Sequence, residues 1–344
     1  MKGSLFGDYR VIKPVGALPQ PAEILNNDMS ILYDNEIRVN VETLNVDSAS
    51  FTQIKNQANG DLKKIEEIIL SIVNKTGKLK NPVTGSGGMF IGEVDKIGKD
   101  LKERPLKKGD KIASLVSLSL TPLKIDKIIK VKPDIDQVDI KGQAILFESG
   151  IYSPLPSDIA PTLALAVLDV CGAPAQTARL VKSGDIVVII GASGKSGILC
   201  AYTSKRKVGH KGMVIGVASS DKGLKRLYDL NICDINTRFD ATDALSAFKE
   251  IEKLTDGKLA DVVINCVNVP NTEMASILVC KERGTLYFFS MVTSFTKAAL
   301  GAEGVGKDIN MIIGNGYAQG HADISLNIIR ESRKIRILYE KLYC

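Results

Sequence analysis

Three glycines at a spacing of three residues lie within 191–197, directly after an apolar, β-branched run at 187–190. A helix-like segment follows at 198–205, and a second apolar run at 213–218 has the length of a strand. A pyrophosphate binds at such a turn because glycines let the backbone approach it and a helix N-terminus offers free N–H groups to an anion. The pattern predicts a dinucleotide site; a purely structural strand-to-helix turn is the alternative.

Two acidic residues stand in apolar surroundings, where a charge needs a partner. Glu148 follows the apolar run 144–147, and Asp169 lies among the apolar residues 163–170. Such a carboxylate is either paired within the protein or serves a ligand as counter-ion or proton acceptor. For Glu148 the structural alternative is an ion pair at a domain junction, and for Asp169 it is a partner in the core.

The cysteines and histidines are too sparse for a metal or disulfide framework. The six cysteines lie far apart without a Cys-x-x-Cys pair, and the chain has only two histidines. We therefore expect no metal site, and reduced thiols in a cytoplasmic protein.

Charge and hydropathy point away from nucleic acid and membrane partners. The net charge is +6, the lysines are scattered, and tryptophan is absent, which favours a solvated surface over a nucleic-acid patch. No apolar run approaches the roughly 18 residues of a membrane span, and no secretory leader is apparent.

The first part of the chain, 1–155, is predicted to be a β-rich domain. Residues 36–41 alternate like a half-buried strand, and shorter strands are expected at 92–98 and 111–116. One helix is expected at 61–76: Asp61 is a capping residue and Gly77 follows the last turn. Its apolar face is predicted to comprise Leu62, Ile65, Ile69 and Ile72.

The second part, 156–344, is predicted to be an α/β domain with a doubly wound parallel sheet. A connecting helix is expected at 162–180, disturbed near Gly172 and Pro174. Strands alternating with helices at this spacing favour a parallel sheet. The expected strands are 186–190, 213–218, 262–266, 285–290 and 310–313, and a basic amphipathic helical region is expected at 322–343.

A β-rich domain, a connecting helix and a nucleotide domain, with the turn 108–112 about 80 residues before the glycines, together resemble the medium-chain dehydrogenase/reductase superfamily. The resemblance implies a Rossmann domain and an N-terminal GroES-like substrate domain. Zinc-dependent members carry a ligand histidine where this chain has Gly87-Gly88-Met89, and Asp47 stands near the place of their first ligand cysteine. The resemblance therefore implies hydride chemistry without a metal.

Glycine-rich and polar blocks spread over the chain resemble a narrower family of nicotinamide-dependent amine dehydrogenases that act on a diamino acid. The blocks are 44–51, 81–89, 117–123, 145–152, 264–274 and 294–308. The resemblance implies oxidative deamination, in which an amine, water and the oxidised cofactor yield a ketone, ammonium and the reduced cofactor.

Asp47 is the first catalytic candidate that this resemblance supplies, followed by Glu148 and Asp169. The structural alternative for Asp47 is a local cap or turn in an Asp-Ser-Ala-Ser segment. Hydroxyls for the substrate carboxylate are expected from Ser86, Ser119 and Thr121. The cofactor is expected to contact Gly191, Ser193, Gly194, Lys195, Ser196, Gly197, Ser219, Ser220, Lys222, Asn265, Cys266 and Val267.

The expected cofactor is NAD, and NADP stays possible. NAD-binding folds place an acid at the end of the second strand, where this chain has Ala218. Asp221 comes a few residues late, while Lys222, Lys225 and Arg226 could meet a 2′-phosphate.

Two other functions remain open at this point, and a homodimer is implied by the superfamily resemblance. One is a zinc-free quinone or enoyl reductase on the same scaffold, in which Asp47 and Glu148 would not converge. The other is a nucleotide-binding protein without catalysis, which would show salt-sensitive RNA binding and no cofactor turnover.

Overall fold

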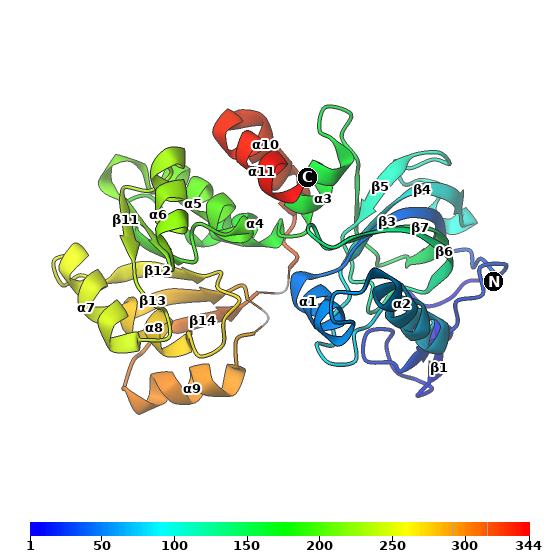
Figure 1. The fold of residues 1–344 in the computed structure, drawn as a ribbon, viewed down its shortest axis with the longest axis horizontal. Helices are drawn as coiled ribbons and strands as arrows, with labels where there is room; N and C mark the ends of the chain where they lie inside the picture. The colour runs from blue at the N-terminus through cyan, green and yellow to red at the C-terminus, as the bar shows by residue number, and fades with distance from the viewer. Residues whose placement is uncertain (291, 315) are drawn as a thin grey trace. The chain divides into compact units, whose positions relative to one another are not determined.

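The computed structural model describes residues 1–290, 292–314 and 316–344 and divides into two compact units, each with its own sheet (Figure 1). The first unit comprises Met1–Asp169 with Leu342–Cys344, and the second comprises Val170–Lys341. The sequence-based boundary at residue 155 stays a prediction; the units meet in the chain 14 residues later, after Asp169.

An antiparallel six-stranded sheet of order β6-β7-β3-β4-β5-β8 forms the first unit, with β1 and β2 paired separately. Its strands are β1 (Val11–Lys13), β2 (Ile24–Leu25), β3 (Glu36–Asn45), β4 (Met89–Ile97), β5 (Lys111–Ser114), β6 (Leu123–Lys132), β7 (Gln137–Phe147) and β8 (Tyr152–Pro154). Its helices are α1 (Ser48–Gln57), α2 (Leu62–Thr76) and α3 (Pro161–Leu168), with short 3-10 turns at Asp8–Arg10 and Lys99–Leu101. The β-rich prediction for this part of the chain is confirmed.

β3 is a central strand of the sheet, and its alternate side chains enter the core. Ile37, Val39 and Val41 are buried, and the strand continues past the predicted end to Asn45. The register pairs Glu36 at one end of β3 with Phe147, and Asn45 at the other end with Gln137 and Met89. Phe147 and Gln137, the last and first residues of β7, therefore lie beside opposite ends of β3.

The predicted helix at 61–76 is confirmed as α2, with one correction to its apolar face. Asp61 accepts hydrogen bonds from the N–H groups of Lys63 and Lys64, and Gly77 ends the helix with a left-handed φ of 73°. The buried residues are Ile65, Ile69 and Val73, whereas Leu62 is 46% exposed. Leu62 is the first helical residue and precedes the turns that face the core.

The second unit holds a six-stranded parallel sheet of order β11-β10-β9-β12-β13-β14. Numbered from β9, this is the 3-2-1-4-5-6 order of a dinucleotide-binding fold, and it confirms the predicted doubly wound sheet. The strands are β9 (Ile186–Ile190), β10 (Met213–Ala218), β11 (Ile235–Arg238), β12 (Ala260–Asn265), β13 (Cys280–Phe288) and β14 (Asn310–Ile313).

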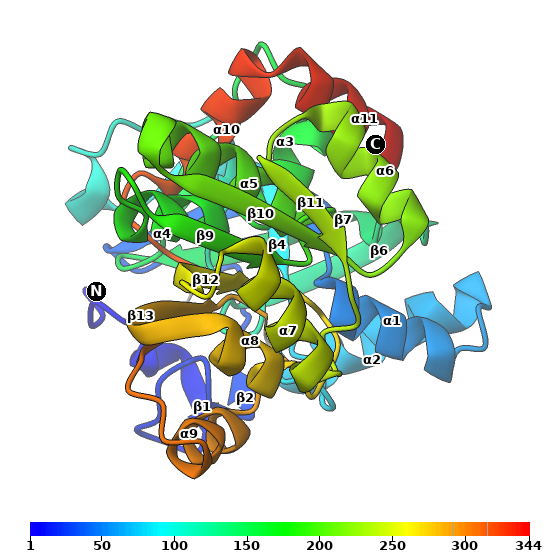
Figure 2. The ribbon, with the colours of Figure 1, turned by 90° about the vertical axis from the view of Figure 1, so that its left-hand side faces the viewer.

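Helices cover both faces of this sheet, with α5 and α6 on one face and α7, α8 and α9 on the other (Figures 1 and 2). The helices of the unit are α4 (Gly172–Leu180), α5 (Lys195–Val208), α6 (Asp221–Leu230), α7 (Ala244–Leu254), α8 (Glu273–Val279), α9 (Phe295–Gly304), α10 (His321–Glu331) and α11 (Arg333–Tyr343), with a 3-10 turn at Gly209–Lys211. This layering buries the apolar strands on both sides and leaves their carboxyl ends for a ligand.

Two predicted helices are each divided in the structure. The expected helix at 162–180 forms α3 and α4 with a break at 169–171, and the C-terminal helical region forms α10 and α11 with a break at Ser332. Pro174 lies in the first turn of α4, where a proline is tolerated because its missing N–H has no helical acceptor. Within the described part of the chain, no helix is both long and apolar enough to span a bilayer.

Lys78 is a fully buried amine in the first unit, and it makes stability depend on pH. Its Nζ donates hydrogen bonds to the carbonyls of Pro19, at 2.6 Å, and Gln20, at 3.2 Å. Burial lowers the pKa of Lys78 from its usual value to about 8.

Between this pKa and the unfolded value near 10.5, the unfolded chain binds more protons than the folded chain, so stability rises with pH. We expect the free energy of unfolding of Lys78→Met to lack this rise between pH 8 and 10.5. The difference from wild type is measured by urea denaturation, with the exposed Lys75→Met as control. Parallel pH curves for Lys78→Met and wild type would contradict the prediction.

Candidate functional site

The glycine turn after β9 is shaped so that side chains are excluded. Gly191 has a φ of +83°, and a Cβ there would lie 2.9 Å from Val267 Cγ2. A Cβ on Gly197 would lie 2.1 Å from the carbonyl oxygen of Gly191. These contacts explain the first and third glycines of the motif: one permits the turn, and the other lets α5 pack against it.

The N-terminus of α5 offers its N–H groups without a side-chain cap. Gly194 occupies the capping position and makes no side-chain hydrogen bond. Ser193, Lys195 and Ser196 flank it, and the Lys195 carbonyl accepts a hydrogen bond from the Tyr339 hydroxyl. A helix of 14 residues whose N-terminus lacks a side-chain cap and directly follows a glycine turn fits a pyrophosphate.

The end of β10 presents hydroxyl and basic groups. Ser219, Ser220 and Lys222 are exposed, and Ser220 caps α6 by accepting a hydrogen bond from the Gly223 N–H at 3.1 Å. Asp221 does not stand free for a ribose, because Arg238 Nη1 donates to its Oδ1 at 2.7 Å.

Arg238 is a residue that the sequence analysis missed. It ends β11 and pairs in register with Ala218, the last residue of β10. A basic residue at the end of the third strand is the signal that could have found it. Arg226, in contrast, donates to the carbonyl of Ser193 at 2.5 Å, so its guanidinium supports the glycine turn.

The side chain of Asn265, at the end of β12, makes hydrogen bonds to residues that follow it in the chain. Its amide nitrogen donates to Thr272 Oγ1 and Ser276 Oγ, both at 2.9 Å, and its oxygen accepts the Val267 N–H at 2.9 Å. These bonds hold the turn that contacts Gly191. A direct role of Asn265 toward the cofactor stays a prediction.

Cys266 follows and packs as a thiol. Its Sγ lies 4.0 Å from Cys200 Sγ on α5, and burial raises the pKa of Cys200 well above its usual value. A buried neutral thiol beside Cys266 agrees with a packing role.

Asp47 caps α1 with one carboxylate oxygen, while the other oxygen makes no hydrogen bond with the described residues. Its Oδ1 accepts a hydrogen bond from the Ser50 N–H at 3.0 Å, which confirms the local cap expected as the alternative. Its Oδ2 is buried and has no hydrogen-bond partner among the described residues. A buried carboxylate oxygen without a donor is costly, and this atom can accept a hydrogen bond from a ligand.

Asp169 is joined to the same place by Asn45, the last residue of β3. Asn45 is 3% exposed, and its amide nitrogen donates to Asp169 Oδ1 at 3.1 Å. A Cβ on Gly88 would lie 2.0 Å from the Asn45 carbonyl oxygen and 2.8 Å from the Asp47 nitrogen. Glycine at 88 thus lets the 81–88 loop pack against the end of β3.

The predicted hydroxyls belong to the same region of the first unit. A Cβ on Gly87 would lie 2.8 Å from the Ser119 nitrogen. Ser119 Oγ lies 2.8 Å from Ser117 Oγ, and Thr121 Oγ1 donates to the Ser117 carbonyl at 2.9 Å. Ser119 and Thr121 are 1% exposed, so these hydroxyls are shielded from water.

Ser86 lies in the 81–88 loop and makes two hydrogen bonds within it. Its carbonyl accepts a hydrogen bond from the Asn81 N–H at 2.8 Å, and its own N–H donates to Thr84 Oγ1 at 3.3 Å. Binding of the substrate carboxylate by Ser86, Ser119 or Thr121 stays a prediction.

Glu148 is not brought to this region. It follows Phe147, which pairs with Glu36 at the far end of β3, about 30 Å from Asn45 at roughly 3.3 Å per residue. Its Oε2 accepts a hydrogen bond from Asn35 at 3.2 Å. Asp47 and Glu148 therefore do not converge, and a catalytic role of Glu148 stays a prediction without geometric support.

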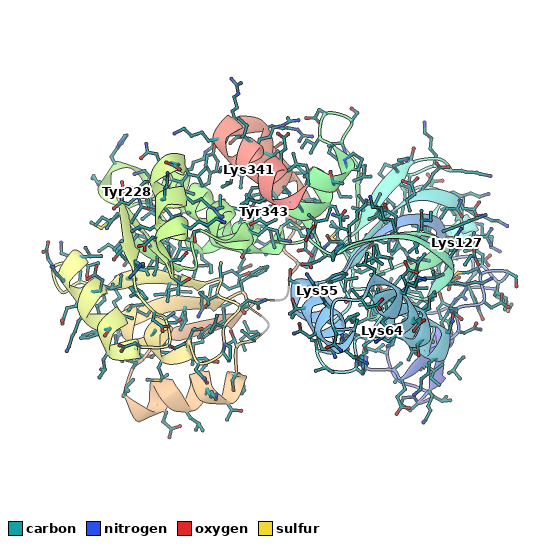
Figure 3. The ribbon with its side chains drawn as sticks, in the orientation of Figure 1. Lys55, Lys64, Lys127, Tyr228, Lys341 and Tyr343 are labelled. Atoms are coloured by element: carbon teal, nitrogen blue, oxygen red, sulfur yellow. The ribbon has the colours of Figure 1, made fainter. Side chains whose placement is uncertain are left out.

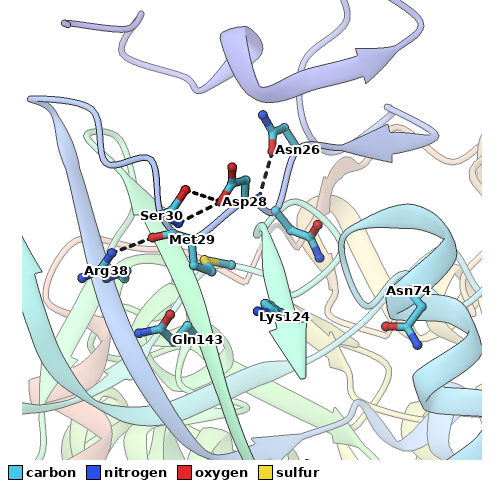
Figure 4. A pocket seen from close by; sticks show the side chains of 9 residues that line it. Asn26, Asp28, Met29, Ser30, Arg38, Asn74, Lys124 and Gln143 are labelled. Carbon is cyan, nitrogen blue, oxygen red and sulfur yellow. Dashed lines mark hydrogen bonds between the residues drawn. The ribbon is translucent and has the colours of Figure 1, made fainter. Parts of the chain in front are cut away.

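A polar cavity of about 660 Å³ opens elsewhere in the first unit (Figure 4). It is lined by Asn26, Asn27, Asp28, Met29, Ser30, Arg38, Asn74, Lys124 and Gln143. Arg38 donates to the Met29 carbonyl at 2.6 Å, and the Ser30 hydroxyl lowers the pKa of Asp28. These two charged groups are engaged within the chain, and the cavity lining contains neither Asp47 nor Asp169.

No candidate metal centre is evident in the described part of the chain. Among residues 1–290, 292–314 and 316–344, no three His, Cys, Asp or Glu side chains gather in a way that could hold a metal ion. Lys55, Lys64 and Lys127 lie on α1, α2 and β6 respectively (Figure 3).

Comparison with known proteins extends over the whole chain. Residues 9–156 match the family model described as "L-erythro-3,5-diaminohexanoate dehydrogenase N-terminal domain". A protein of Acetoanaerobium sticklandii named L-erythro-3,5-diaminohexanoate dehydrogenase is 58% identical over 344 residues, covering 100% of both chains. A protein of the same name from Fusobacterium nucleatum is 56% identical over 343 residues, covering 99% of each.

Solved structures agree with the fold. An alcohol dehydrogenase from Thermotoga maritima superposes with a TM-score of 0.55 at 17% identity, covering 91% of this chain and 86% of that one. The predicted medium-chain dehydrogenase/reductase fold is confirmed at this level.

Proposed function

The chain belongs to the L-erythro-3,5-diaminohexanoate dehydrogenase family, and on this premise we propose that the region around Asp47 performs the oxidative deamination of this diamino acid. The chain is an oxidoreductase acting on a CH–NH2 group. The diamino acid, the oxidised nicotinamide cofactor and water yield (S)-5-amino-3-oxohexanoate, ammonium, the reduced cofactor and one proton. The place of this reaction in lysine fermentation is part of the proposal.

The buried, unpartnered Oδ2 of Asp47 is the observation that carries the proposal. The amine must be neutral before it can lose a hydride, because an ammonium has no lone pair to assist, and an alkyl ammonium has a pKa of about 10. The Asp47 carboxylate pairs with the ammonium and accepts its proton. The cap from Ser50 holds Oδ1 in place, so Oδ2 faces the ligand without reorganisation.

A nicotinamide dinucleotide fits the second unit. The glycine turn at 191–197 and the uncapped N-terminus of α5 would hold the pyrophosphate, and Ser219 and Ser220 would meet the adenosine ribose. When bound, the cofactor supplies a hydride acceptor. We propose NAD, following the family resemblance. NADP remains the alternative, because the exposed side chains of Lys222 and Arg238 could contact its 2′-phosphate.

The competing functions have less support. Asp47 and Glu148 do not converge, and this is what a quinone or enoyl reductase would show. However, relatives that match the chain over its full length at 56–58% identity are named as amine dehydrogenases. That name likewise does not favour a nucleotide-binding protein without catalysis.

The direct test supplies L-erythro-3,5-diaminohexanoate with NAD and, separately, NADP, and follows the absorbance of the reduced cofactor. We expect turnover, with NAD preferred. Absence of turnover with both cofactors would overturn the proposed function.

We further propose a homodimer that forms through β14. This strand lies at one edge of the parallel sheet, and Met311 and Ile313 on it are 36% and 53% exposed. An exposed apolar edge strand is a template for pairing with another chain.

Ile313→Lys is expected to convert the dimer to a monomer, because a charged side chain blocks edge pairing. Light scattering after size-exclusion chromatography measures the mass. Val83→Lys, at an apolar position in the first unit that is 70% exposed, is the control and is expected to stay dimeric. A wild-type monomer, or an Ile313→Lys dimer, would refute this interface.

A cytoplasmic location is also proposed. The proposal is supported by the six cysteines, none of which is joined in a disulfide, since reduced cysteines are typical of a reducing compartment.

A further inference from the structure

Two buried hydrogen-bond acceptors without donors lie at the same end of the sheet in the first unit. One is Asp47 Oδ2, and the other is the amide oxygen Oε1 of Gln137, a residue that is 1% exposed. Gln137 stands directly opposite Asn45 in the β3–β7 pair. Since directly opposed residues share a face of the sheet, the Gln137 and Asn45 side chains lie on the same side.

Asn45 places a third acceptor group beside them. Its amide nitrogen holds Asp169 Oδ1 at 3.1 Å. Asp47 follows Asn45 by two residues, and Leu44 and Val46, which alternate with them, are both buried in the core; this alternation places the Asn45 and Asp47 side chains on the other face. Asp47, Gln137 and Asp169 are thus grouped around Asn45.

The chemistry of this group calls for a ligand rich in donors and positive charge. Its carboxylate and amide oxygens accept hydrogen bonds, and Asp47 Oδ2 has no donor among the described residues. One ammonium donates three hydrogen bonds. The substrate carries two ammonium groups, on carbons separated by a single methylene.

We propose that Asp169, held by Asn45, and Gln137 bind the second ammonium group of the substrate, and that this subsite selects diamino acids over monoamino acids. The inference rests on the proposed function, in which Asp47 serves the reacting amine. Asn45 fixes Asp169 Oδ1 by its hydrogen bond, which suits a counter-ion, whereas the unpartnered Oδ2 of Asp47 suits a contact with the reacting amine.

Selectivity follows from the interactions that a smaller substrate cannot make. A monoamine would leave the Gln137 oxygen without a donor and would bring no second positive charge to Asp169. Sites built around a polar group reject analogues that lack it by large factors. We expect wild type to prefer L-erythro-3,5-diaminohexanoate over 3-aminohexanoate by at least about 100-fold in kcat/KM.

The test compares kcat and KM for both substrates in Asp169→Asn and Gln137→Leu. We expect each variant to raise the KM for the diamino acid about tenfold or more and to lower the preference for the diamino acid over 3-aminohexanoate, in kcat/KM, by a similar factor. Gln143→Leu, a partly exposed residue of the same strand, is the control and is expected to keep the wild-type ratio.

Gln137→Leu also separates binding from folding. Replacing a buried acceptor that lacks a donor by an apolar group of similar size is neutral or stabilising for the fold, so urea denaturation is expected to show no loss of stability. A merely structural Gln137 would not change the substrate ratio.

An equal loss for both substrates in Asp169→Asn, or an unchanged ratio in Gln137→Leu, would overturn the subsite while the proposed function stands. Failure of wild type to oxidise the diamino acid with either cofactor would instead overturn the proposed function and the subsite together.

Discussion

Asp47→Asn is expected to lower kcat for the diamino acid by about 10²–10⁴-fold, the usual contribution of a positioned proton acceptor. Asparagine is as good a helix cap as aspartate, so it can still accept the Ser50 N–H at the start of α1. The substitution therefore removes the charge and basicity at Oδ2 while it preserves the local fold. Steady-state rates with saturating cofactor measure the effect.

The matched control is Asp61→Asn. Asp61 caps α2 as Asp47 caps α1, but its Oδ1 accepts two backbone N–H groups on an exposed helix end. We expect Asp61→Asn to retain wild-type kcat within about twofold. A folded Asp47→Asn enzyme with a wild-type rate would remove Asp47 from the catalytic site.

Glu36→Gln is expected to destabilise the first unit by about 3–5 kcal/mol, because it leaves the buried Arg10 without its counter-charge. Arg10 and Glu36 are 1% and 0% exposed and form two hydrogen bonds of 2.6 Å. Arg10 also donates to the carbonyls of Asn26, Asp28 and Ile31, so the pair ties the N-terminal segment to the start of β3. Urea denaturation monitored by circular dichroism gives the free energy.

An exposed ion pair supplies the comparison. Lys13 Nζ and Glu23 Oε2 lie 2.8 Å apart, but the side chains are 63% and 61% exposed, and Glu23→Gln is expected to leave the free energy of unfolding nearly unchanged because solvent screens the pair. Equal effects of Glu36→Gln and Glu23→Gln would show that burial does not govern the Arg10 pair.

Local patterns predicted the nucleotide unit well. The strands at 186–190, 213–218 and 310–313 have the predicted bounds, because a buried parallel strand is a continuous apolar run and its glycine turn is contiguous in sequence. The bounds of the divided helices were less accurate, since interruptions at 169–171 and at Ser332 depend on packing rather than on propensity.

The proposed substrate region was only partly predictable. The superfamily layout supplied Asp47 as a candidate, whereas Gln137 and Asn45 were not among the predicted residues, although Asn45 stands two residues before Asp47 at the end of a strand. Asn45 meets Asp169 across 124 residues of sequence. Nothing local marks such a pair, because the antiparallel register and the chain path of α3 create it.

By itself, the sequence determined the fold class, the glycine turn for a dinucleotide and, through long shared blocks, the family of amine dehydrogenases, because these features lie in contiguous residues. Tertiary structure decided which acids stand together. It placed Glu148 at the opposite end of β3 from Asp47 and gathered Gln137 and Asp169 around Asn45. Strand register sets which distant residues share an end and a face of the sheet, and the chain path of α3 brings Asp169 to that end.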